Sequence, residues 1–113
     1  MASLENKEIV NILKQFFSEI YHHKAPINGV YPVVVYKLLT QSASLRADNR
    51  TKGFQAVYRI TVIDKVEYNP KDLILAFENA GWLWENTNVT VDTGENEIDE
   101  VYTTVDISKL LLV

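Results

Sequence analysis

Cysteine is absent from this 113-residue sequence, which excludes disulfides, thiolate metal sites and cysteine catalysis. Glycine and proline are scarce, with four and three residues, and no phosphate-binding glycine motif or serine-nucleophile motif occurs. No apolar run approaches the roughly 20 residues that cross a bilayer. The opening MASLENKEIV is acidic where a secretory signal would be basic, so we expect a cytoplasmic chain with no membrane partner.

A basic net charge is missing as well. Fifteen acidic residues outnumber eleven basic ones, and the formal net charge is −4. Nucleic-acid binding needs an extended basic surface, so we expect no sequence-specific nucleic-acid partner. The hydrophobic share of 47% and the charged share of 23% are typical of one globular domain over residues 1–113.

Apolar periodicity predicts an α+β fold with the order α-β-β-α-β-β. We expect two hairpins to form a four-stranded antiparallel sheet, with both helices packed on one face. The second helix has Asn69 as its N-cap, Pro70 at its first position and Gly81 after its last turn. The predicted helices cover residues near 4–23 and 70–80, and the predicted strands cover residues near 31–40, 54–64, 83–91 and 101–108.

The expected core combines the apolar stripes of both helices with the inward face of the strands. Its members are Ile9, Ile12, Leu13, Phe16, Ile20, Val34, Tyr58, Ile60, Val62, Leu73, Phe77 and Val105. The first strand, with Val33, Val34 and Val35 in succession, is apolar on both faces. An apolar sheet face that no helix covers marks a partner surface. Alternatively, the apolar residues 110–113 fold over that face.

The polar segment TQSASLRADNRTKG, residues 40–53, lies between the first two predicted strands and is far longer than a hairpin turn needs. It carries a local positive charge, and the segment DTGENEIDE, residues 92–100, carries a strong negative charge. Opposite charges suit a contact between subunits or with a partner, although charged loops are commonly only solvated. The candidate contact residues are Arg46, Arg50, Lys52, Asp92, Glu95, Glu97, Asp99 and Glu100.

Other candidate sites have simpler interpretations. His22 and His23 are adjacent, so on a helix they point about 100° apart and do not chelate a metal as an i, i+4 pair does. We interpret them as a solvated helix end. Asp64 and Asp106 are the only carboxylates in or at the ends of strands that an acid–base mechanism could use. Without a motif around them, we expect no catalytic residues, no cofactor and no metal.

Trp82 and Trp84 share a strand parity and could form a stacking platform for a sugar or a peptide. Tryptophan pairs at the start of a strand more often pack beneath a helix. A contact with another subunit is a further alternative.

The segments YPVVVYKLL, FQAVYRITVID, PKDLILAFENA and VYTTVDISKLLL follow an N-terminal amphipathic helix. In this order, over essentially the whole chain, they resemble the tail-terminator and tail-completion proteins of long-tailed bacteriophages. The Tyr31-Pro32 entry to the first strand and the aliphatic end of the last strand carry the resemblance.

The resemblance implies a structural virion protein of the tail and neck that assembles in the cytoplasm of the bacterial host. Such proteins form a homo-oligomeric ring, commonly of six subunits, that ends the tail tube and joins it to the head connector. They have no catalytic residues, and their long hairpin contacts a neighbouring subunit, the tube or the connector. The alternative is a small cytoplasmic module that binds a protein or peptide through an exposed apolar sheet face.

Overall fold

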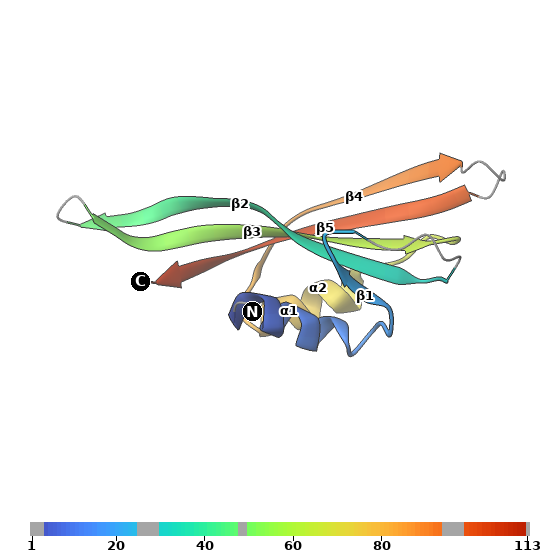
Figure 1. The fold of residues 1–113 in the computed structure, drawn as a ribbon, viewed down its shortest axis with the longest axis horizontal. Helices are drawn as coiled ribbons and strands as arrows, with labels where there is room; N and C mark the ends of the chain where they lie inside the picture. Colours follow the sequence, from blue (N-terminus) through green and yellow to red (C-terminus); the bar gives the residue numbers. More distant parts are fainter. Residues whose placement is uncertain (1–3, 25–29, 48–49, 94–98, 113) are drawn as a thin grey trace.

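The computed structural model describes residues 4–24, 30–47, 50–93 and 99–112. It confirms the α+β class, with two helices on one face of a long twisted sheet (Figure 1). The sheet is five-stranded and mixed, with the strand order β1-β2-β3-β5-β4, so the four-stranded antiparallel sheet expected from the sequence is wrong in detail. The elements are α1 (Leu4–Leu13), β1 (Ile20–His22), β2 (Val33–Ala47), β3 (Arg50–Asp64), α2 (Lys71–Asn79), β4 (Leu83–Thr93) and β5 (Asp99–Leu112).

The first helix ends ten residues earlier than predicted, at Leu13. The amides of Phe16 and Phe17 both donate to the Leu13 carbonyl, at 3.0 and 2.8 Å, which tightens the last turn and stops the helix. Phe17 then packs in the core, whereas Phe16 is 37% exposed, so its predicted place in the core is wrong. The α-helical spacing seen in the sequence therefore continues past the residue where the helix itself ends.

The residues after this turn form β1, which pairs in parallel with β2 over Val34–Tyr36. Ile20, predicted as a helical core residue, lies in this strand and packs against the core while only partly buried. The β-branched and aromatic pair Ile20-Tyr21 favours a strand, and its backbone satisfies the outer edge of β2. The residue before the strand takes part as well, since the Val34 amide donates to the Glu19 carbonyl at 2.9 Å.

The polar segment 40–53 is strand rather than loop over the part that the structure describes. β2 and β3 stay paired as far as Ala47 opposite Arg50, well beyond the predicted ends at residues 40 and 54. Figure 1 shows this hairpin extending past the helices. Because no helix covers it, neither face needs apolar side chains, and the alternating pattern that identifies a strand is missing there. We call this projecting part of the hairpin, residues 40–47 of β2 and 50–53 of β3, the arm.

The core lies between the two helices and the central part of the sheet. Ten of the twelve predicted core residues are buried; Phe16 and Ile20 are the exceptions. Buried residues that the sequence did not identify include Phe17, Tyr36, Ala56, Trp82 and Ile107. No helix among the described residues is long and apolar enough to cross a membrane.

The second helix follows the sequence closely. It starts one residue later than predicted, with Pro70 as N-cap, and the Lys71 amide donates to the Asn69 side-chain oxygen at 3.1 Å. Gly81 follows it with φ of 91°, the left-handed conformation for which glycine has no steric penalty. Its buried residues, Leu73 and Phe77, face the sheet.

We expect Phe77→Ala to lower the free energy of unfolding by about 3–5 kcal/mol, because it leaves a cavity in the place of a fully buried ring. Urea denaturation would measure the loss. Leu75→Ala on the same helix is the matched control, since Leu75 is 47% exposed and its truncation leaves no cavity. Equal stability of the Phe77 and Leu75 variants would show that the buried face of α2 is wrongly assigned.

Candidate functional site

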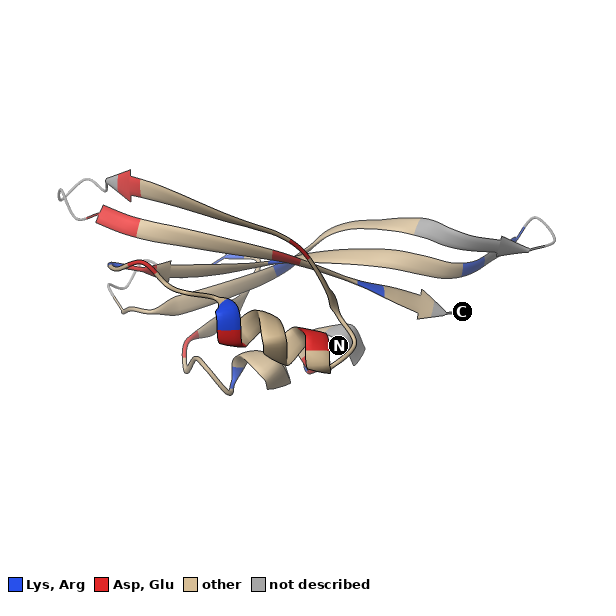
Figure 2. Cartoon of the chain, turned by 180° about the vertical axis from the view of Figure 1, so that it is seen from behind, with Lys and Arg blue, Asp and Glu red and all other residues tan. Residues whose placement is uncertain are grey.

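The basic and acidic segments lie at opposite ends of the sheet (Figure 2). The molecule measures 57 × 27 × 25 Å, and the strands run along its long axis. At the arm end Arg50 and Lys52 are exposed, and Arg46 lies in β2 opposite Thr51. At the other end Asp92 and Asp99 are exposed where β4 ends and β5 begins. Glu95 and Glu97 lie outside the described residues, so Asp92, Asp99 and Glu100 define the position of the acidic segment.

This separation follows from the pairing of β3 with β5. β3 runs from the arm toward Asp64, which pairs with Val101 near the start of β5. The end of β4 and the start of β5, with Asp92 and Asp99, therefore lie at the end of the sheet that is farthest from the arm. Within one subunit the two charged segments cannot form a contact, and each is available to a different neighbour.

Glu100 differs from the other acidic candidates because it is bonded within the chain. The Tyr31 hydroxyl donates to one of its carboxylate oxygens at 2.6 Å, and the Tyr102 hydroxyl is 3.4 Å from the other. Its carboxylate raises the pKa of Tyr31, because the phenol that donates to an anion holds its proton more firmly. Glu100 thus fixes the chain that enters β2 onto the start of β5.

The two strand carboxylates form no acid–base pair. Asp106 is buried and accepts two hydrogen bonds from the Arg59 guanidinium, at 2.9 and 3.1 Å. The two residues are directly opposite across β3 and β5, so this is a cross-strand ion pair. Asp64 accepts the amide of Lys65 at 2.7 Å at the end of β3. Each carboxylate is therefore bonded to a neighbouring group of the chain. An acid–base mechanism would instead need a reactive carboxylate in a pocket.

His22 and His23 are not a helix end, as predicted, but the end of β1. The His22 ring stacks between His23, at a centroid distance of 3.8 Å, and Tyr36, at 4.6 Å. His23 has a positive φ of 74°. Among the described residues no group of three metal-ligating side chains gathers, here or elsewhere. The stack therefore closes the short β1 strand onto β2.

The two tryptophans do not form a common platform. Trp82 is buried, with its ring edge-on to Tyr58 and Phe77. Its indole NH donates to Glu8 at 2.6 Å, and Lys109 bonds the same carboxylate at 2.9 Å, which links α1 to β5. Trp84 is half-exposed, and its indole NH donates to Thr87 at 2.9 Å. The packing interpretation is thus confirmed for Trp82 alone.

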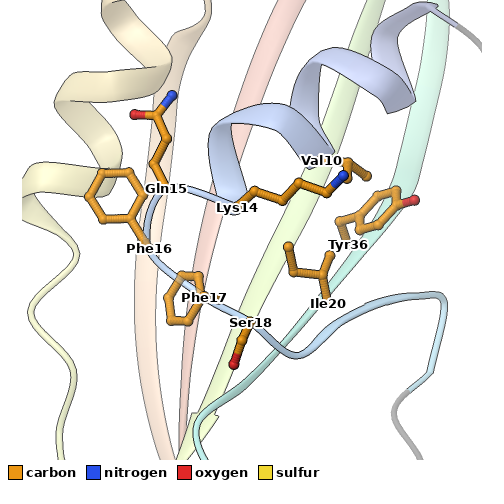
Figure 3. Close-up of a pocket in the computed structure, with 8 residues that line it drawn as sticks. All are labelled: Val10, Lys14, Gln15, Phe16, Phe17, Ser18, Ile20 and Tyr36. Atoms are coloured by element: carbon orange, nitrogen blue, oxygen red, sulfur yellow. The ribbon is translucent and has the colours of Figure 1, made fainter.

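A shallow hollow lies between the end of α1 and the first strands (Figure 3). In Figure 3 the Lys14 side chain runs past Val10 toward Tyr36, while Phe16 points to the opposite side. None of the eight lining residues is a carboxylate or a histidine. The hollow has a mixed polar and apolar lining, in which Lys14 is the one charged residue.

The uncovered apolar face predicted for β2 is not exposed. Val33 and Val35 point away from the helices, yet they are only 4% and 8% exposed. Tyr31 reaches Glu100 near this face, and Tyr21 pairs beside Val35. The exposed large apolar side chains of the sheet lie mainly in its outer strands and at the end of β5, and comprise Leu38, Leu39, Leu83, Trp84, Val89, Val91 and Leu110. The edges, rather than that face, are the apolar surface available to a partner.

No protein-family model matches this chain, and no curated protein matches it at a significant level. The structure places opposite charges at the two ends of a long sheet and apolar side chains along its edges.

The His22 stack predicts a pH dependence of stability. Burial, and secondarily His23, lower the pKa of His22 below its ordinary value of 6.5. A lowered pKa means that the folded state favours neutral His22, so this contribution is complete above pH 6.5 and is lost as the pH falls toward the folded-state pKa. We expect His22→Gln to narrow the difference in melting temperature between about pH 7.5 and about pH 5. The same difference in both proteins would contradict a titrating role for the stack.

Proposed function

We propose that this chain is a structural subunit of the neck of a long-tailed bacteriophage. In this role it forms a homo-oligomeric ring, with six subunits as the expected number, that ends the tail tube and joins it to the head connector. Its place is the virion, after assembly in the cytoplasm of the bacterial host. The chain acts through its surfaces and uses no catalytic group.

The observation that carries the proposal is the separation of charge along the sheet. A joining protein needs two different contact surfaces, one toward the tube and one toward the connector. If subunits stand side by side with their strands in the same direction, every arm lies on one rim of the ring and every acidic turn on the other. One rim is then basic and the opposite rim acidic, which gives the ring two distinct faces.

Electrostatics of this kind sets orientation and rate more than affinity. Exposed ion pairs contribute only about 0–1 kcal/mol each, and salt screens them. Complementary potentials nevertheless accelerate encounter and penalise the reversed orientation. The charged rims would therefore direct each face of the ring to its own partner, while apolar contacts supply most of the association energy.

A second arrangement uses the same charges between subunits. In a head-to-tail contact, the basic arm of one copy meets the acidic turn of the next. The candidate residues for it are Arg46, Arg50 and Lys52 on one side, and Asp92, Glu95, Glu97, Asp99 and Glu100 on the other. Because the segments lie at opposite ends of a 57 Å molecule, such a contact joins copies end to end.

A protein- or peptide-binding module is the second candidate function. The exposed apolar residues at the sheet edges favour it, because an extended peptide binds an open edge by adding a strand. The oligomeric state separates the two functions. Light scattering over a range of concentrations gives a ring-sized mass for the neck protein and a constant monomer mass for the module.

We expect the triple variant Arg46→Glu, Arg50→Glu, Lys52→Glu to form rings but to fail in joining tails to heads. Counting joined particles by electron microscopy in a complementation assay measures the effect. The control reverses three exposed lysines away from the arm, Lys7, Lys24 and Lys71, with the same change in net charge.

A compensating variant assigns the partner of the arm. Adding Asp92→Lys, Glu95→Lys and Glu97→Lys, which leaves the Tyr31–Glu100 hydrogen bond intact, restores joining if the arm binds the acidic turn of another copy. Continued failure assigns the arm to the tube or the connector. Normal joining by the arm variant alone would refute a role for the basic arm.

A further inference from the structure

Two backbone edges of the sheet lie open at the same level on opposite sides. On one side, β1 covers β2 only over Val34–Tyr36, and from Lys37 onward the outer side of β2 has no strand beside it among the described residues. On the other side, β4 begins at Leu83, opposite Ser108, so the part of β5 from Lys109 to Leu112 is likewise open. An open edge is a row of unpaired amides and carbonyls that accepts another strand.

The register across the sheet shows that the two open edges match in height. Gln41 pairs with Ala56, and Ala56 pairs on its other side with Lys109. Ala43 is related in the same way, through Phe54, to Leu111. Within these stretches the pairing has no register shift. The open segments Gln41–Ala43 and Lys109–Leu111 therefore lie on opposite sides of the sheet at one level.

The direction of the strands also matches. β2 and β5 are both antiparallel to β3, so they run parallel to each other. When two copies stand side by side in the same orientation, the β2 edge of one faces the β5 edge of the next, and a parallel strand pair can form. The two edges are different surfaces, so the contact is heterologous, the kind that closes a ring.

Side chains beside the two edges are complementary at the same level. In the strand register Lys37 pairs with Arg59, Arg59 with Asp106, and Asp106 with Asn86. Asn86 adjoins the bulge that contains Glu85, so Lys37 and Glu85 lie at the same level. Lys37 and Glu85 are both exposed, one on each side of the sheet, and the Glu85 carboxylate also accepts a hydrogen bond from the Ser108 hydroxyl at 2.5 Å. In the same register Leu38 pairs with Tyr58, Tyr58 with Ile107, and Ile107 with Trp84. Leu38 and Trp84 are both exposed. A neighbouring copy would thus place a cation against an anion and a leucine against a tryptophan.

The β5 edge lacks the devices that proteins use to block strand addition. Residues Lys109–Leu112 contain no proline and no bulge relative to β3, and their only charge is Lys109, which bonds Glu8 and the Ala80 carbonyl. Leu110 points away from the helices and is 43% exposed. An edge so apolar and regular is prone to bind a further strand unless another chain covers it.

We propose that the β5 edge, Lys109–Leu112, and the β2 edge from Lys37 to Ala43 form the seam between neighbouring copies of this chain. The seam joins the two sheets into one, with Lys37 facing Glu85 and Leu38 facing Trp84 across it. It rests on the proposed function for the claim that copies form a ring, and it specifies which strands meet there. In this arrangement only the base of each arm lies in the seam, and its outer end, with Arg46, Arg50 and Lys52, stays on one rim for a different partner.

A charged side chain on the edge tests the seam. In sedimentation velocity over a concentration series, Leu110→Lys should raise the concentration for half-assembly about tenfold or more, because a charge at the seam loses its hydration on assembly. The matched control is Leu75→Lys, an exposed leucine on α2 that belongs to neither edge segment, which should assemble as the wild type does. Hydrogen exchange should also show slower amides at 109–112 in the assembled wild type than in the Leu110→Lys protein.

A charge exchange tests the seam with a different substitution. Lys37→Glu alone and Glu85→Lys alone should each weaken assembly by roughly fivefold, and the double variant should recover most of the loss. Lys52→Glu, a reversal on the arm, is the control and leaves half-assembly unchanged. Circular dichroism shows whether each variant retains the sheet, and the charge exchange keeps the test valid if Leu110→Lys misfolds.

The outcomes separate this inference from the proposed function. If Leu110→Lys assembles like the wild type, or if the double variant recovers nothing, the seam is wrong while the ring stands. If the wild type stays monomeric at every concentration, both the ring and the seam are refuted. If rings form through this seam but the arm variant joins tails normally, the seam stands and the neck function proposed through the arm is refuted.

Discussion

The fold depends on one strand, β3, that is paired along nearly its whole length on both sides. β2 covers one of its edges and β5 the other, so β3 is the centre of the sheet. Its helix-facing residues, Ala56, Tyr58, Ile60 and Val62, are all buried and form the surface on which both helices pack. The same strand sets the direction of β2 and β5, and therefore where every turn and edge of the molecule lies.

The residues that pack against β3 were predictable because burial imposes a pattern. Helix α2 has a proline-led start, a stripe of apolar residues and a glycine at its end, and each has a local physical cause. The end of α1 could not be predicted in this way. Phe16 and Ile20 keep the helical spacing in the sequence. The end of the helix is evident only in the structure, where Phe17 rather than Phe16 is buried in the core.

The arm was missed for the opposite reason. A strand is recognised in a sequence by the alternation that one buried face imposes. Residues 40–53 have no helix above them, so nothing selects apolar side chains at alternate positions, and the backbone pairing of β2 with β3 leaves no trace in composition. The charged segments were identified correctly as polar, but their opposite placement depends on β5 pairing beside β3, which the sequence alone does not specify.

The candidate surfaces follow from a mismatch between a long sheet and short helices. Helices of ten and nine residues cover only the middle of a sheet whose strands reach fifteen residues. The ends and edges of such a sheet have paired backbone inside and unpaired backbone outside, and the chain has no further element to cover them among its described residues. Where β1 supplies a cover, it is three residues long. In the assembly we propose, a second copy would provide this cover, because a strand added at the edge satisfies the unpaired backbone and buries the exposed leucines beside it.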